Sequence, residues 1–160
     1  PNTVNSFGAN AFYNCNSLKS ITLPKNLKTI ETSVFGDCTA LTSITLPEAL
    51  TLISSGAFYG CVGLTDITIP NSVKEIGNNA FHYCLGLTNV NLPNGLNRIG
   101  VDAFAKCTFT SVNMPRTTGW QVLPSKGGAL TSLKKTDLEN PETVAKYLTQ
   151  TYSSYFWRLK

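Results

Sequence analysis

Cysteine is the residue type in this sequence whose spacing could build a metal centre or a set of disulfides. Five cysteines recur at a constant interval of 23 residues: Cys15, Cys38, Cys61, Cys84 and Cys107. A structural zinc site gathers its thiolates from closely paired positions such as Cys-x-x-Cys, and no such pair occurs here. In a stack of coils, Cα atoms about 5 Å apart would allow a disulfide by distance, but parallel Cβ vectors disfavour its dihedral angle. We therefore predict buried free thiols that pack as small hydrophobic groups, and no metal site.

His82, the single histidine of the sequence, is the other candidate for chemistry. A catalytic serine or cysteine needs an adjacent base, which a third group usually orients. The positions one period before and after His82 hold Tyr59 and Ala105, so the position varies and is expected to be exposed. Because no carboxylate pair recurs and no phosphate-binding loop is present, the sequence favours a protein that is not an enzyme and uses no cofactor.

Charge divides the chain into two parts. The net charge is +4, with 13 basic and 9 acidic residues. Residues 1–115 hold six of each sign, so the positive excess lies in residues 116–160, where the basic residues are dispersed. Nucleic-acid binding requires clustered lysine and arginine, and a membrane span requires about 18 or more apolar residues in succession. The sequence shows neither pattern, so we expect no nucleic-acid partner and no direct membrane insertion.

A 23-residue repeat supplies the elements that must position any site. Phenylalanine follows the same interval as cysteine: Phe12, Phe35, Phe58, Phe81 and Phe104. One full period reads G-x-x-A-F-x-x-C-x-x-L-x-x-I-x-L-P-x-x-L-x-x-I, and five periods occupy residues 1–115. The fifth period is one residue shorter after its cysteine, which places Phe109 at the leucine position.

Each period predicts one coil of a leucine-rich-repeat solenoid. The I-x-L pair alternates between inside and outside, as in a short half-buried strand, and the following proline ends the strand because it cannot donate to the ladder. The A-F-x-x-C segment suits one helical or 3₁₀ turn on the opposite wall. Because one coil cannot bury its own apolar face, neighbouring coils must stack. The predicted fold is a solenoid with a parallel β-sheet on one face and short helical or 3₁₀ turns on the other.

The string A-F-x-x-C-x-x-L-x-x-I-x-L-P, repeated across residues 1 to about 115, resembles the BspA-type leucine-rich repeat. The resemblance implies a secreted or cell-surface location, since members of that family are surface or secreted proteins of anaerobic bacteria, spirochaetes and some parasitic protists. It also implies adhesion to host proteins, aggregation or engagement of a host receptor. These functions follow from the resemblance and not from the spacing of the residues.

The outward-facing strand residues are the candidate partner-binding site. They lie between the buried leucine and isoleucine positions and form an almost uncharged ladder of Thr, Ser and Asn. The set comprises Lys19, Ser20, Thr22, Thr42, Ser43, Thr45, Thr65, Asp66, Thr68, Thr88, Asn89, Asn91, Thr110, Ser111 and Asn113. Threonine is a good strand former, and threonine rows stabilise sheets. The ladder is therefore explained equally well by folding and solubility and by a broad hydrogen-bonding surface for a protein or a glycan.

Residues 116–160 depart from the repeat and are expected to form a small C-terminal cap that contains a helix. Asn140-Pro141-Glu142 combines an N-cap, proline at the first helical position and an acidic residue in the first turn, which predicts a helix over about 141–152. The aromatic residues of this part either cover the last coil or form a docking surface for a partner. The candidate surface consists of Trp120, Tyr152, Tyr155 and Trp157.

The first residues are interpreted as part of an earlier repeat, because residues 1–8 align with residues 70–77. A solenoid needs a terminal cap over its open core, and no such segment is present before the first coil. We therefore expect the chain to be a fragment of a longer array. Self-association through the open N-terminal edge, or through the aromatic C-terminus, is a further expectation.

Two functions are open on the sequence alone. The leading hypothesis is a protein–protein interaction module of a secreted or cell-surface protein, which adheres to host or neighbouring-cell proteins. The alternative is a structural spacer or self-association module of a larger surface protein, with no ligand of its own. Loss of partner binding after lysine substitution on the strand face would favour the first hypothesis.

Overall fold

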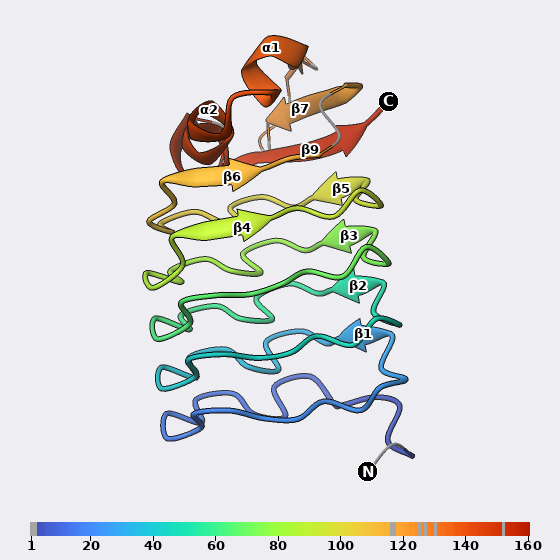
Figure 1. The fold of residues 1–160 in the computed structure, drawn as a ribbon, viewed down its shortest axis with the longest axis vertical. Coiled ribbons are helices and arrows are strands. Elements are labelled where there is room, and N and C mark those ends of the chain that lie inside the picture. Colours follow the sequence, from blue (N-terminus) through green and yellow to red (C-terminus); the bar gives the residue numbers. More distant parts are fainter. Residues whose placement is uncertain (1–2, 116–117, 125, 127, 130, 152) are drawn as a thin grey trace.

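The chain winds into a stack of coils that form a three-walled solenoid (Figure 1). The computed structural model describes residues 3–115, 118–124, 126, 128–129, 131–151 and 153–160. Residues 23 positions apart lie one above the other. The rings of Phe12 and Phe35 stack with their centroids 5.5 Å apart, and those of Phe81 and Phe104 are 5.2 Å apart. The predicted stacking of 23-residue coils is therefore confirmed.

The first wall carries the predicted I-x-L strands. β4 (Asn89–Asn91) pairs in parallel with β6 (Ser111–Asn113), and isolated parallel bridges continue this ladder through earlier coils. Val90, at the centre of β4, is buried, whereas both its neighbours are exposed. We call this surface the threonine wall and define it as residues 19–23, 42–46, 65–69, 88–92 and 110–114.

The second wall is a parallel ladder that the sequence analysis did not predict. It consists of four two-residue strands: β1 (Thr29–Ile30), β2 (Leu52–Ile53), β3 (Glu75–Ile76) and β5 (Arg98–Ile99). Residues 23 apart are in register, and the isoleucine of each strand is buried in the core. The last two residues of the closing L-x-x-I therefore also form a strand in each of the first four periods. Two residues are too few for an alternating pattern to be recognised in a sequence.

The third wall holds the A-F-x-x-C segments, and here the predicted helical or 3₁₀ turn is wrong. No helix forms in the described part of the chain up to residue 115. Backbone N–H groups alternate between two kinds of acceptor. Phe58 donates to the Ala80 carbonyl oxygen in the next coil at 2.8 Å, whereas Tyr59 donates to Gly56 within its own coil at 2.9 Å. We call this stack of tight turns the turn wall, formed by residues 32–38 and their equivalents in the other coils.

Left-handed residues explain why these turns do not continue as a helix. In every coil two positions, four residues apart, have φ between +52° and +68°. They are Asn10, Asn14, Ser33, Asp37, Gly56, Gly60, Asn79, Tyr83, Asp102 and Lys106. Most are Asn, Asp or Gly, which adopt this conformation with the least strain. The sequence thus contained a partial signal for the turns. The first left-handed position is Asn, Asp or Gly in four of the five coils, but both positions are so in only two of them.

Lys106→Gly is expected to stabilise the protein, because Lys106 is exposed and has a φ of +65°. The left-handed conformation costs a residue with a Cβ atom about 1–2 kcal/mol, and glycine loses part of this gain through its greater freedom in the unfolded chain. We expect a Tm about 2 °C higher in thermal unfolding followed by circular dichroism. Lys28→Gly, at an exposed position without a positive φ, should lower the Tm. A rise of similar size in both variants would contradict the explanation.

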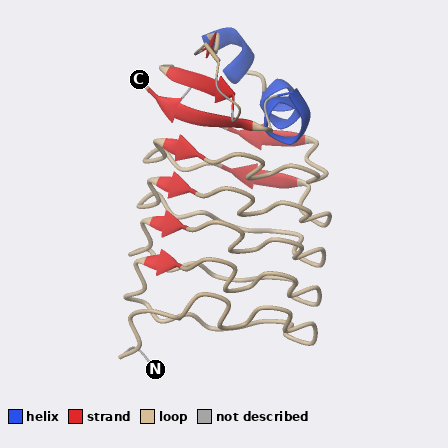
Figure 2. Ribbon diagram, turned by 180° about the vertical axis from the view of Figure 1, so that it is seen from behind, coloured by secondary structure: helices blue, strands red, loops and turns tan. Residues whose placement is uncertain are grey.

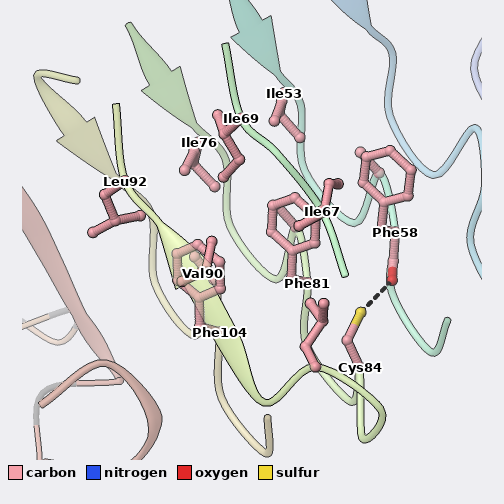
Figure 3. Close-up of a cluster of buried hydrophobic side chains, with 14 of the residues drawn as sticks. Ile53, Phe58, Ile67, Ile69, Ile76, Phe81, Cys84, Val90, Leu92 and Phe104 are labelled. Carbon is pink, nitrogen blue, oxygen red and sulfur yellow. Dashed lines mark hydrogen bonds between the residues drawn. The ribbon is translucent and has the colours of Figure 1, made fainter. Parts of the chain in front are cut away.

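The three walls enclose the core, whose centre is the column of stacked phenylalanine rings (Figure 3). Phe58 and Phe81 are completely buried, and their rings are nearly parallel at 5.2 Å. In the view of Figure 3, the Val90 side chain of the threonine wall lies over the Phe104 ring, and Ile76 enters the same core from the second wall. Large aromatic groups supply much of the buried apolar area in such a core.

The cysteine column lines the same core. Four of the cysteines are buried free thiols as predicted, but Cys15 is exposed, and the prediction is wrong for that residue. Each buried thiol also donates a hydrogen bond to a phenylalanine carbonyl oxygen in the preceding coil. Cys84 Sγ lies 3.1 Å from the Phe58 oxygen (Figure 3). The thiols therefore satisfy carbonyl groups that face the apolar interior, besides filling space.

The described residues from 118 onward form a small layer next to the last coil (Figure 2). β9 (Tyr155–Leu159) pairs antiparallel with β5, and β7 (Trp120–Pro124) pairs with β9 and with β8 (Thr131–Ser132). The complete sheet has the order β1-β2-β3-β5-β9-β7-β8. The helices α1 (Lys135–Leu138) and α2 (Pro141–Lys146) lie at the same end, and α2 contacts β6. This layer therefore contacts the last coils through the pairing of β9 with β5 and through the contact of α2 with β6.

The α2 helix begins as the sequence pattern predicts. Asn140 Oδ1 accepts the Thr143 N–H at 2.9 Å, and proline occupies the first helical position. The α-helical part is shorter than the predicted 141–152, because the chain continues as a π-helix, η1, over Tyr147–Thr151. Tyr152 lies outside the described residues. None of the helices in the described ranges is long and apolar enough to cross a membrane.

Candidate interaction surface

The structure places all fifteen candidate strand residues on the threonine wall. Fourteen are exposed, and Ser111 is half-buried. The register of β4 and β6 places Asn89 beside Ser111 and Asn91 beside Asn113. The other candidates occupy the equivalent positions of earlier coils. The wall therefore presents columns of small polar side chains, repeated about every 5 Å along the solenoid.

Some polar groups of this wall are used within the solenoid. Ser111 Oγ donates to Asn89 Oδ1 at 2.9 Å, and Thr42 Oγ1 donates to the Lys19 carbonyl oxygen at 3.4 Å. These bonds link neighbouring coils, which agrees with a role of the ladder in folding. Within the described residues, the Thr45 hydroxyl makes no such bond and remains available to a partner.

Two shallow hollows adjoin on the threonine wall. Their volumes are about 330 Å³ and about 250 Å³, and Thr45 lines both. The lining of the first also includes Ile21, Thr22, Leu23, Lys25 and Pro47. The lining of the second also includes Ser43, Ile44, Leu46, Glu48, Asp66, Ile67, Thr68 and Pro70. Together the hollows extend across the first three coils.

The edge of these hollows was missed by the sequence analysis. The candidate set contained the hydroxyl side chains of the strands but omitted residues that follow them, such as Pro47, Glu48 and Pro70. The signal that could have found this edge is the proline that recurs at the end of each I-x-L pair. Glu48 and Asp66 give the second hollow two carboxylates, whereas Lys25 lines the first.

The prediction of an exposed aromatic docking surface is wrong for its two tryptophans, because both are buried. Trp120 is 2% exposed and Trp157 is 1% exposed, and their rings meet edge to face at 6.3 Å. Trp157 lies opposite Ile99 where β9 pairs with β5, so both side chains are buried in the layer over the last coil. Tyr155 is half-buried, and Tyr152 lies outside the described residues.

Burial changes the ionisation of the cysteine column. Desolvation of the thiolate by the core raises the pKa of Cys61 and of Cys107 to about 12, and it raises the pKa of Cys84 well above its usual value. A thiol that stays protonated is a poor nucleophile and a poor metal ligand. No group of three or more potential metal ligands occurs within the described residues.

Ellman's reagent is expected to titrate one thiol in the native chain. Cys15 is exposed, whereas the other four cysteines are buried and therefore inert toward a reagent that attacks thiolates. All five should react after unfolding in urea, and a Cys15→Ser variant should show no fast reaction in the native state. A second fast-reacting thiol in the native wild type would contradict the closed packing of the coils.

His82 was predicted to be exposed, but it is half-buried on the turn wall. Its Nδ1 lies 2.8 Å from Asn79 Oδ1, and its ring stacks on that of Tyr83 with centroids 4.8 Å apart. Partial burial is the main reason that the pKa of His82 is lowered from its ordinary value. The histidine is therefore neutral near pH 7 and held in place by its neighbours.

Comparisons with known proteins agree with this architecture. The model of the BspA type leucine-rich repeat region matches residues 5–120 in six copies. A leucine-rich repeat protein from Bacteroides ovatus is 39% identical, with a TM-score of 0.69 over 73% of this chain and 30% of that one. A T. pallidum leucine-rich repeat protein is 38% identical, with a TM-score of 0.68 over 70% of this chain and 53% of that one.

A leucine-rich cell surface protein from Faecalibacterium prausnitzii is 27% identical, with a TM-score of 0.59 over 84% of this chain and 44% of that one. The chain thus spans between 30% and 53% of the length of these three solved structures. No curated protein matches it significantly. Because the repeat model covers most of the sequence and the described coils have the corresponding architecture, the chain belongs to the BspA-type leucine-rich repeat family.

Proposed function

We propose that this chain is a protein-binding module of a secreted or cell-surface protein, and that the threonine wall is its binding face. The observation that carries the proposal is the pair of adjoining hollows across the first three coils. Solenoids bind partners over extended repeat surfaces of this kind. The F. prausnitzii structure, which is named a cell surface protein, supports the proposed location.

An extended segment of a host or neighbouring-cell protein suits this face. Ile21 and Leu23 line the first hollow and can contact apolar side chains, while exposed hydroxyl groups such as that of Thr45 can bond to a backbone. Glu48 and Asp66 in the second hollow favour a lysine or arginine of the partner. Adhesion through many such weak contacts is the proposed biological role.

The layer that follows the repeats is proposed to act as a C-terminal cap. In this division, residues 1–115 form the binding array and residues 116–160 close it. The pairing of β9 with β5 and the contact of α2 with β6 support the proposal, since they join this layer to the last coils. A terminal coil without such a cover would expose apolar core to water.

A triple variant, Thr45→Lys, Thr68→Lys and Asn91→Lys, tests the binding face. All three residues are exposed on the threonine wall, so the variant should fold while its long charged side chains fill the hollows and their rims. Retention on immobilised extracellular-matrix and cell-surface proteins would be measured by surface plasmon resonance. We expect a wild-type interaction to weaken about tenfold or more in the variant.

A second triple variant provides the matched control. Thr51→Lys, Val62→Lys and Asn97→Lys add the same charge at exposed positions outside the threonine wall, and this protein should bind like the wild type. Equal binding by both triple variants would exclude the threonine wall as the binding face. The complete absence of a partner in a broad screen would favour the structural spacer instead.

A further inference from the structure

A separate groove of about 430 Å³ lies on the turn wall. Its lining residues recur at 23-residue intervals, so the groove runs along the solenoid axis across several coils. One column of the lining consists of Ser33, Gly56 and Asn79, which occupy one of the left-handed positions of each coil. Gly56 is buried, and the other two are half-buried. Gly56 adds no side chain to this column, and a Cβ atom there would lie 3.0 Å from Ser33 Oγ.

Aromatic rings form one side of this groove. Tyr13, Tyr59 and His82 follow the core phenylalanine in their coils, and the first two are 50% and 36% exposed. The equivalent residue between the two tyrosines is Gly36, and a Cβ atom there would lie only 2.8 Å from Tyr13 Cδ2. Tyr13 leans over this glycine and donates a hydrogen bond to Asp37 Oδ2 at 2.8 Å. The Tyr13 ring is therefore held in place over Gly36, while about half of the residue remains exposed.

Uncharged polar groups form the other side. Thr32, Ser55 and Asn78 occupy equivalent positions in three successive coils and supply hydroxyl and amide groups. No Asp, Glu, Lys or Arg belongs to the described lining of the groove. His82 is the one titratable imidazole there, and its lowered pKa leaves it neutral near pH 7. The groove therefore offers hydrogen bonds and aromatic contacts without a net charge.

We propose that this groove binds a neutral oligosaccharide. A sugar ring has an apolar C–H face that packs on an exposed aromatic ring, and its hydroxyl groups exchange hydrogen bonds with amides and hydroxyls such as those of Asn78 and Ser55. Three coil spacings separate Tyr13 from His82, which gives a length of roughly 15 Å and accommodates several sugar units. An acidic glycan finds no cation in the lining, and a protein hot spot would need a deeper apolar pocket.

The inference concerns a different wall from the proposed protein-binding face, so each can fail without the other. The chain would be applied to an array of neutral and acidic oligosaccharides, and the best-bound neutral one would be titrated by calorimetry. We expect neutral oligosaccharides to bind, and Tyr59→Ala to weaken binding about tenfold or more. Tyr59→Phe, which keeps the ring, should retain most of the affinity.

A second pair of variants guards against a folding defect at Tyr59. Ser55→Lys places a long side chain in the groove from an exposed position, whereas Thr65→Lys adds the same charge on the threonine wall. The first should abolish oligosaccharide binding and the second should leave it unchanged, at equal Tm. Binding of acidic oligosaccharides alone, no binding at all, or equal binding by Ser55→Lys and Thr65→Lys would overturn the proposal. So would a Tyr59-dependent protein partner without any oligosaccharide binding.

Discussion

Phe58→Ala is expected to lower the free energy of unfolding by about 3–5 kcal/mol. The Phe58 ring is completely buried at the centre of the column, and it stacks on Phe35 at 5.4 Å and on Phe81 at 5.2 Å. Alanine removes both ring contacts and leaves a cavity that coils bonded above and below cannot close. Urea unfolding followed by circular dichroism, with linear extrapolation to water, would measure the loss.

Phe12→Ala is the matched control for this change. Phe12 belongs to the same column but is only partly buried in the first coil, so its loss should be clearly smaller. Stability in a solenoid is approximately a sum over the contacts between neighbouring coils. Because Phe58→Ala weakens these contacts in the middle of the stack, it should also broaden the unfolding transition. Equal losses in the two variants would show that the column is not the main source of cohesion between the coils.

Stability is also expected to fall steeply at alkaline pH because of the cysteine column. The pKa of Cys61 and of Cys107 is raised to about 12 by burial, and the pKa of Cys84 is raised well above its usual value. In the unfolded chain these thiols lose their protons near an ordinary thiol pKa of about 8.5–9. Between these pH values the folded state binds more protons than the unfolded state, so raising the pH favours unfolding.

For each thiol held protonated in the folded state, the free energy of unfolding falls by about 1 kcal/mol or slightly more per pH unit. The three thiols together therefore lower it by roughly 4 kcal/mol per pH unit above about pH 9. Because small proteins are stable by about 5–15 kcal/mol, we expect unfolding near pH 11. Circular dichroism in urea at a series of pH values from 8 to about 11 would follow the effect.

The triple variant Cys61→Ser, Cys84→Ser and Cys107→Ser separates this effect from the ionisation of lysine and tyrosine. Serine retains a hydroxyl donor for the phenylalanine carbonyl oxygens but does not ionise in this range. The variant should be less stable than the wild type at pH 7, with a shallower decline above pH 9. Parallel declines of the two proteins would mean that the thiols do not control the alkaline transition.

The sequence alone determined the repeat and the contents of its core. A strict 23-residue interval of Phe and Cys can be satisfied only if equivalent residues occupy equivalent places in successive coils, so stacking and the inward columns followed directly. The fifteen strand residues were likewise placed on one surface by the alternation of buried and exposed positions. Their ability to bind a partner remains a prediction, because small polar residues serve a sheet as well as a binding face.

The turn wall and the second ladder were decided by tertiary structure. Ala, Phe and Cys at these spacings fit the inward face of a helical turn, but left-handed residues such as Gly56 and Gly60 and hydrogen bonds to the next coil produce stacked turns instead. These bonds join residues 22 or more positions apart, and local propensity carries no information about them. The two-residue strands such as β2 exist for the same reason, since each forms only when its neighbouring coil supplies a partner.

The remaining sites also depend on tertiary contacts. Trp120 and Trp157 are typical of an exposed docking surface by composition, and they are buried because β9 pairs with β5 and brings them onto the last coil. Tyr13, Tyr59 and His82 line the groove on the turn wall. The residue type at their position differs from repeat to repeat, so the repeat pattern did not identify them. Periodic residues reveal what each coil must share, whereas residues that differ between coils acquire their neighbours only when the coils stack.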